Sequence, residues 1–227
     1  LDLRLSAESP SADLATYEAS VGQVEPAVAR WLPGLTGAPV RYARSATFLV
    51  SRPGEPPADL SVAPRGSFHT LTRYEDKLDL AAGRFPHAGP VASESAFTIE
   101  ALALESGAKA LDLNPGDTMA FTPYWEERTP RVHVQIVGVA RIKDPQDPFW
   151  TAPVLSRFTA EPTLFNTLPV LVAEETLSET LGPAFPEMDA TYAWHFPVRT
   201  EALHASNAEA TLAGVRILDG VLARNVP

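Results

Sequence analysis

The sequence predicts an α+β protein: mixed small sheets with βα units, a smaller subdomain, and two antiparallel terminal helices that form a stalk. Two observations predict this class. Between residues 38 and 198 the apolar residues form short runs or alternate with polar ones, as in strands, and 22 prolines favour turns and edge strands. Both ends of the chain instead carry apolar residues at helical spacing. With 227 residues, 45% of them apolar, the chain can bury a core.

The first helix is expected within residues 1–34. Ser9 is a good N-cap and Pro10 a good first helical residue, while Pro33 followed by Gly34 ends the helix. Its apolar residues form a narrow stripe at alternating spacings of three and four: Leu14, Tyr17, Val21, Val24, Val28 and Trp31.

The last helix is expected within residues 199–227, where Thr200 supplies a capping hydroxyl and Glu201 a first-turn acid. Its apolar residues form a second narrow stripe: Ala208, Leu212, Val215, Leu218 and Leu222. Because the two stripes match, we expect the helices to bury them against each other as an antiparallel stalk. The alternative is that each stripe packs on its own domain, as most such stripes do.

The main α/β part is expected between the helices, at residues 38–150. The clearest strand covers residues 131–142, where apolar and polar residues alternate. Further strands are predicted near residues 40–50 and 118–122, and residues 89–107 are interpreted as a short strand followed by a helix that ends at Gly107.

A second subdomain, or a second βα unit, is expected at residues 151–198. Residues 168–182 repeat the pattern of a strand followed by a helix, and their VAEET resembles the VASES of residues 91–95. Residues 190–198 are predicted to form one more strand.

Composition excludes several classes of function. The formal net charge is −10 and no basic stripe is visible, so we expect no nucleic-acid partner. The absence of cysteine excludes disulfides, thiolate metal sites and thiol catalysis. No apolar run approaches the ~20 residues of a membrane span. Because the chain starts at Leu1 without an initiator Met and ends directly after a helical pattern, we expect it to be a piece of a longer polypeptide that holds membrane segments elsewhere.

Residue types that carry catalysis are present without the spacing that their chemistry needs. Ser93 and Ser95 lie outside any G-x-S-x-G turn and are interpreted as helix caps. No phosphate-binding glycine loop occurs. The histidines show neither H-E-x-x-H nor H-x-H spacing, and those at 133 and 195 are interpreted as partly exposed strand residues: His69, His87, His133, His195 and His204.

Two weaker signals involve loop residues. Neither Glu126 with Glu127 nor Asp144 with Asp147 matches the spacing of a calcium loop, so solvated acids are the favoured interpretation. The aromatic pair Phe149–Trp150 is either a ligand-stacking platform or, as we favour, a plug at the edge of the core. A carboxylate pair for glycoside hydrolysis is spatial and stays open. The sequence thus predicts no catalytic, cofactor-binding or metal-binding residue, and no cofactor.

Four segments between about residues 80 and 150 resemble, in the right order, the MacB-like periplasmic core domain of FtsX-family ABC transporter permeases. The first is a Gly-Arg turn at Gly83 and Arg84, and the second is VASESA at residues 91–96. The third is LNPGD at residues 113–117, and the fourth is Val-Gly-Val at residues 137–139.

The resemblance implies one porter-like, extracytoplasmic domain over residues 1–227, inserted between the first two transmembrane helices of a permease in the cell membrane. It implies mechanotransmission: a cytoplasmic ATPase subunit moves the helices, and the stalk carries the motion to the outer domain, which is no enzyme. Other partners would be a second permease copy and an extracytoplasmic partner protein or cargo. The alternatives are an independent secreted glycan-binding module or hydrolase, and a regulator that binds a partner protein outside the cell.

Overall fold

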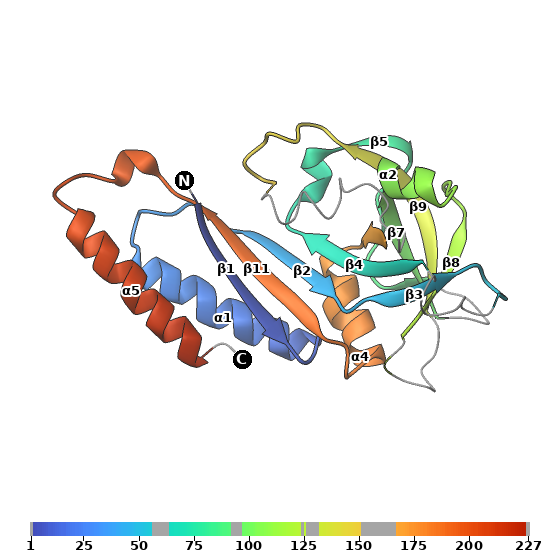
Figure 1. Cartoon of the computed structure of the whole chain (residues 1–227), viewed down its shortest axis with the longest axis horizontal. Helices are drawn as coiled ribbons and strands as arrows, with labels where there is room; N and C mark the ends of the chain where they lie inside the picture. Colours follow the sequence, from blue (N-terminus) through green and yellow to red (C-terminus); the bar gives the residue numbers. More distant parts are fainter. Residues whose placement is uncertain are drawn as a thin grey trace.

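The computed structural model describes residues 2–55, 64–91, 97–123, 125, 132–150 and 167–225 of the chain. The strands join in a single eleven-stranded sheet, where we had expected several small sheets. Figure 1 shows two lobes: a three-stranded part of the sheet backed by long helices, and a rolled part at the other end. The combination of sheet and helices agrees with the predicted α+β class. Within the described residues, no helix is both long enough and apolar enough to cross a membrane.

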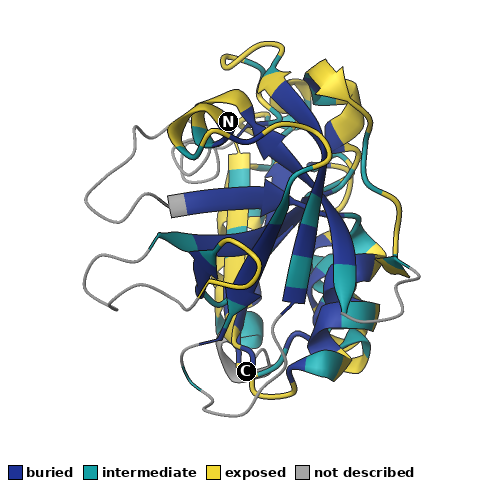
Figure 2. Cartoon of the chain, turned by 90° about the vertical axis from the view of Figure 1, so that its right-hand side faces the viewer, coloured by how far each residue is buried: buried dark blue, intermediate teal, exposed yellow. Residues whose placement is uncertain are grey.

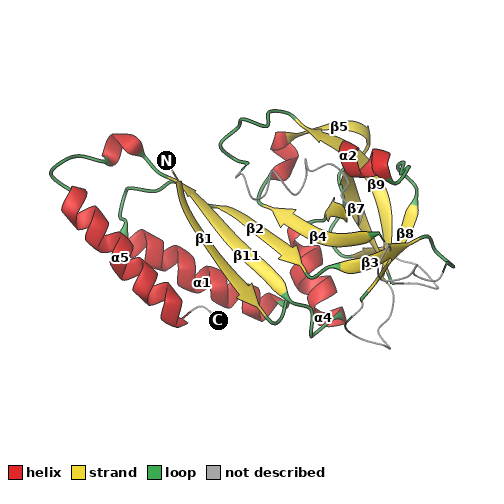
Figure 3. Ribbon diagram, viewed as in Figure 1, coloured by secondary structure: helices red, strands yellow, loops and turns green. Residues whose placement is uncertain are grey.

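The helical lobe is an antiparallel sheet with one helix-covered face. Its strands lie in the order β1 (Asp2–Ser9), β11 (Ala190–Pro197) and β2 (Val40–Ser45). Helix α1 (Leu14–Trp31) covers one face and α5 (Ala208–Asn225) lies beside α1 (Figure 3). On the covered face the rings of Tyr17 from α1 and Tyr192 from β11 lie 5.4 Å apart.

The barrel lobe is a ring of six strands that closes because β3 pairs with both β8 and β4. Around the ring the strands are β4 (Arg65–Leu71), β10 (Thr167–Leu171), β7 (Thr98–Leu104), β9 (Val132–Ile142), β8 (Thr118–Thr122) and β3 (Phe48–Ser51). Two further strands, β5 (Leu78–Gly83) and β6 (Pro90–Val91), pair with β9 and β7. The interior holds an aromatic cluster, in which Phe68 lies 5.2 Å from Phe48 and 4.9 Å from Phe121, and the ring strands are largely buried (Figure 2).

One nearly continuous strand links the lobes. Both β2 and β3 pair with β4, and only Ala46 and Thr47 separate them. At this break the Ser45 hydroxyl accepts a hydrogen bond from the backbone N–H of Phe68 (2.9 Å) and donates one to the carbonyl of Ala46 (2.7 Å). The hydroxyl thereby replaces part of the interrupted ladder.

The expected helix within residues 1–34 is shorter than predicted. Residues 2–9 form strand β1, and Asp13 rather than Ser9 caps the helix by accepting from the backbone N–H of Thr16 (2.8 Å). The prediction missed the alternation of Leu3, Leu5 and Ala7 with polar residues, which is a strand pattern. The stripe on α1 is partly confirmed, because Val24 and Val28 are buried.

The expected stripe on the last helix is largely wrong. The helix begins at Ala208, after a short 3-10 turn η3 (Thr200–Ala202), and runs antiparallel to α1 as expected (Figure 1). Leu218 is buried, but Leu212 and Val215 are 52% and 38% exposed. The reason is Gly214: a Cβ there would lie 2.3 Å from the carbonyl oxygen of Trp31. The helices approach through this glycine, which turns Leu212 and Val215 away.

Residues 98–104 form strand β7, although the sequence suggested a helix that ends at Gly107; that glycine instead lies in the short helix α2 (Glu105–Ala110). Ile99, Ala101 and Leu102 are all fully buried, because β7 has neighbours on both faces, so no alternation marks it as a strand. Of the expected second subdomain, β10 lies within the barrel lobe and β11 within the helical lobe. The predicted succession of strand and helix is present as β10, the π-helical η2 (Thr176–Leu181) and α4 (Gly182–Ala184).

Candidate functional site

Three of the four segments that resemble the permease family meet at one point of β9. Gly83, at the end of β5, pairs with Gly138, and the backbone N–H of Arg84 donates to the carbonyl of Val137 (2.9 Å). From the other side, Gly116 N–H donates to the carbonyl of Ile136 (2.7 Å). The Gly-Arg turn, the LNPGD turn and the Val-Gly-Val strand thus form one packing unit, which we call the β9 junction. Most of the VASESA segment lies outside the described residues.

Glycine is required on both strands of this junction. Gly83 has φ +75°, and a Cβ there would lie 2.1 Å from the carbonyl oxygen of Val137. A Cβ on Gly138 would lie 2.3 Å from the carbonyl oxygen of Arg84. Two backbones therefore cross here at a separation that no side chain permits.

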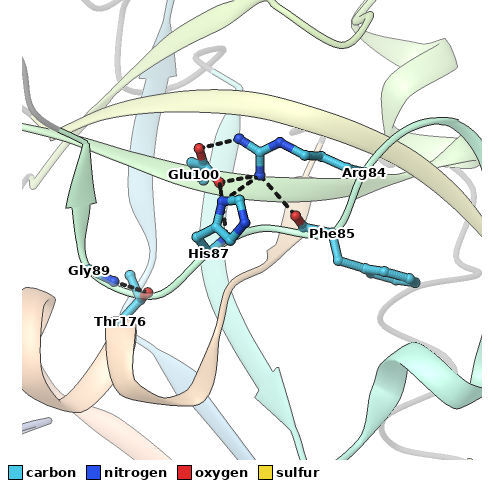
Figure 4. A network of polar contacts seen from close by, with 6 residues as sticks. All are labelled: Arg84, Phe85, His87, Gly89, Glu100 and Thr176. Atoms are coloured by element: carbon cyan, nitrogen blue, oxygen red, sulfur yellow. Dashed lines mark hydrogen bonds and ion pairs between the residues drawn. The ribbon is translucent and has the colours of Figure 1, made fainter.

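Arg84 holds in place residues 84–89, which follow the β9 junction in the chain (Figure 4). Its guanidinium donates to both carboxylate oxygens of Glu100 on β7, at 2.6 and 2.5 Å, and to the carbonyl of Phe85 at 3.0 Å. Glu100 also accepts from the backbone N–H of His87 (2.9 Å). A little further along, Gly89 N–H donates to the hydroxyl of Thr176 on η2 (3.1 Å). Residues 84–89 are therefore tied to both β7 and η2.

The Glu100 carboxylate is held in its ionised form. Hydrogen bonding from Arg84 is the largest influence and, with the His87 N–H, lowers the pKa of Glu100 to about 2, against the opposing effect of burial. A carboxylate that stays ionised at neutral pH and has its oxygens occupied is not a proton donor. The group serves as an anchor for the junction.

The LNPGD turn is a structural connection into β8. The Asp117 carboxylate accepts from the backbone N–H of Asn114 (2.7 Å), and Gly116 has φ +103°. The proline-glycine pair and the aspartate therefore supply turn geometry.

The five histidines lie in separate places. His69 is buried between the hydroxyls of Tyr42 (2.9 Å to Nδ1) and Ser67 (2.7 Å to Nε2). His133 is half-buried in β9, as expected, and His204 is exposed. The expectation for His195 was wrong: it is 6% exposed, with Nε2 3.1 Å from an oxygen of Asp2. The described part of the chain holds no group of three or more metal-binding side chains.

The loop acids form ordinary turn and ion-pair contacts where the structure describes them. Asp147 pairs with the ammonium of Lys77 (2.7 Å), which holds the pKa of the Asp147 carboxyl below its usual range. Asp144 accepts from the backbone N–H of Gln146 (2.8 Å). The remaining candidates lie outside the described residues: Ser93, Ser95, Glu126 and Glu127.

Phe149 and Trp150 lie in different environments, and each fits one of the two interpretations. Trp150 is 6% exposed and plugs the smaller core, as favoured. Phe149 is half-buried and lines a cleft of about 410 Å³. This cleft lies between the two lobes, with walls from β2, β11, the β4–η1 turn and the 147–149 segment. Sequence reasoning missed it because its lining comes from four separate segments, and although Asp147, Phe149 and His195 had been noticed singly, nothing in the sequence places them together.

Comparison with known proteins found no matching family model and no matching curated protein. Among solved structures, the fold is similar to the periplasmic region of MacB from Actinobacillus actinomycetemcomitans, with 11% identity and a TM-score of 0.42 over 97% of this chain and 85% of that one. It is also similar to the extracellular domain of the noncanonic ABC-type transporter YknZ from Gram-positive bacteria, with 14% identity and a TM-score of 0.41 over 97% and 94%. A permease-protein domain from Porphyromonas gingivalis matches at 15% identity and a TM-score of 0.39 over 86% and 70%.

Proposed function

We propose that this chain is the extracytoplasmic domain of an ABC transporter permease subunit, and that it passes the movement of transmembrane helices to the barrel lobe. The β9 junction carries the proposal. The Gly-Arg turn and the LNPGD turn, each a weak signal alone, both hydrogen-bond to β9 at or beside its Val-Gly-Val segment, and the close approach of the Gly-Arg turn requires glycine at positions 83 and 138. Segments that resemble a family in the correct order and also pack together are stronger support than the order by itself.

Two side-chain contacts of α1 support this proposal. The guanidinium of Arg41 on β2 donates to both carboxylate oxygens of Glu25 on α1, at 2.6 and 3.1 Å. At the other end of α1, the Tyr17 hydroxyl donates to the carboxylate of Glu174, which follows β10. Burial raises the pKa of Tyr17, so the phenol keeps the proton that it donates. Helix α1 is thus bonded to its own sheet and to the barrel lobe.

Such an arrangement can transmit force without bond chemistry. Helices are stiff, and packed interfaces change between discrete arrangements more readily than they deform continuously. In this proposal the chain is no enzyme, and a cytoplasmic ATPase acts on it through the transmembrane part. A second permease copy and an extracytoplasmic partner protein or cargo complete the assembly.

The test uses the full-length gene product with its ATPase in lipid nanodiscs. Apolar spans of about 20 residues are expected on both sides of the chain. Cysteines introduced at Ala29, exposed on α1, and at Leu80, 40% exposed on β5, would carry spin labels. We expect the distance distribution between these labels to change when ATP is bound. The matched control places labels at Ala29 and Ala210 on the two paired helices and should stay unchanged.

The outcomes separate the parts of the proposal. Flanking spans with an unchanged Ala29–Leu80 distance would support the permease assignment and contradict transmission by a movement of one lobe relative to the other. A signal peptide, this domain and a stop codon would contradict the permease assignment and favour a secreted module.

A further inference from the structure

The cleft between the lobes has the size and composition of a small-molecule site. Its volume of about 410 Å³ lies within the ~300–1,000 Å³ typical of ligand pockets. Much of its wall is apolar, including Pro39, Val40 and Phe149. The Phe149 ring is held in place by the edge-on ring of Trp150, with centroids 4.9 Å apart, and by the ammonium of Lys77, 5.5 Å from its centroid. The aromatic wall is therefore fixed before any ligand arrives.

The four charged side chains that line the cleft sum to zero, but only two of them form an ion pair with each other. Four charged side chains line it, namely Arg73, Lys77, Asp76 and Asp147. Lys77 and Asp147 neutralise each other through their ion pair. Arg73 and Asp76 make no ion pair, with each other or with any other side chain in the described residues, and their side chains make no hydrogen bond there. One cation and one carboxylate thus remain available at the rim of an apolar cavity.

Arg73 occupies a backbone conformation that suits other residues better. Its φ is +56°, and only one other non-glycine residue in the described part of the chain, Asp112, has a positive φ. Glycine or asparagine adopts this conformation at lower cost than arginine. Backbone strain of this kind clusters at ligand-binding and active sites.

We propose that the cleft binds a short peptide with free termini and an apolar side chain. Its carboxylate would pair with Arg73, its ammonium with Asp76, and its side chain would lie against Phe149 and Val40. A ligand with one charge of each sign complements the unused pair and leaves the cleft neutral. The inference does not depend on the transport role, since the site would exist equally in a secreted binding protein.

The experiment is isothermal titration of the chain with the dipeptide Leu-Phe, its N-acetylated form, its C-amidated form and free phenylalanine. We expect the free dipeptide to bind at least about tenfold more tightly than either blocked form, because each block removes one charge-assisted hydrogen bond. Free phenylalanine binding as tightly would support the same zwitterion chemistry and identify an amino acid as sufficient.

Variants assign each terminus to its partner. In Arg73→Asn the amidated and free dipeptides should bind equally, and in Asp76→Asn the acetylated and free forms should do so. Asn tolerates the Arg73 backbone, so the melting temperature should not fall. The control Asp112→Asn makes the same substitution as Asp76→Asn, at the one other non-glycine residue with positive φ in the described part of the chain, and should leave binding unchanged. No heat of binding at millimolar dipeptide, or equal affinity for free and blocked forms, would overturn the proposal.

Discussion

The two lobes use the same sheet in different ways. In the barrel lobe the ring closes, and residues at successive positions of β7 are fully buried, as Ala101 and Leu102 show. In the helical lobe one face is covered, and β1 alternates between inward and exposed residues. Among the described strands, β1 pairs only with β11 and forms an edge of the sheet, which carries the exposed charges of Asp2, Arg4 and Glu8. Such charges protect an edge from pairing with other chains.

The two lobes therefore depend on different contacts for their stability. A closed ring has no edge and is stabilised by core packing from all sides. The Arg84–Glu100 contact holds the segment that follows β5 against ring strand β7. The helical lobe depends on a single layer of contacts between its sheet, α1 and α5. We therefore expect the effect of a substitution in α1 or α5 on stability to depend strongly on whether the residue faces the rest of the lobe or the solvent.

The largest effect is expected from a charge placed on the buried side of α1. Val24→Asp places a charge at a site that is 2% exposed and should lower the free energy of unfolding by about 3 kcal/mol or more. Leu212→Asp is the matched control, and because Leu212 is 52% exposed it should change stability by no more than about 0.5 kcal/mol. Urea denaturation measures both. Equal losses would mean that α5 buries the side that the sequence pattern suggested.

The next effect tests the barrel lobe. The pKa of Glu100 falls from 4.5 to about 2 on folding. The contribution of Glu100 to the free energy of unfolding is therefore fully present above pH 4.5 and is lost as the pH falls towards 2. Allowing for the partly exposed Arg84, we expect Glu100→Gln to cost on the order of 1–3 kcal/mol at pH 7.

The pH profile is the specific readout for Glu100. Stability measured from pH 7 to pH 2 should fall less steeply in the variant than in the wild type below pH 4.5. Parallel profiles would show that the Arg84–Glu100 contact does not contribute to acid unfolding.

The smallest effect tests the close approach of the helices. Alanine favours a helix over glycine by about 1 kcal/mol, so Gly22→Ala, which has open space around it, should raise the melting temperature. Gly214→Ala should lower it, because its Cβ meets the Trp31 carbonyl oxygen. Thermal unfolding followed by circular dichroism compares the two. A rise in both variants would contradict the α1–α5 contact.

Several elements were predictable because their signals are local. The strands β8, β9 and β11 were expected near their observed positions, since each has alternating or short apolar runs. The turns at Gly83 and at residues 113–117 were recognisable, since glycine and proline mark them directly. Strand β7 was not, since burial on both faces removes the alternation by which a strand is recognised.

Most strands and the two long helices could be located from the sequence, which also lacks the recognisable catalytic motifs. Three features came from the folded chain alone: the side of α5 that faces α1, the pairing of Arg84 with Glu100, and a cleft between the lobes where Arg73 and Asp76 form no ion pair with the described residues. The physical reason is that local patterns depend on neighbours three or four residues away, whereas these contacts join distant positions. Tyr17 and Glu174, for example, are 157 residues apart in the chain, and no periodicity in the sequence reports such a contact.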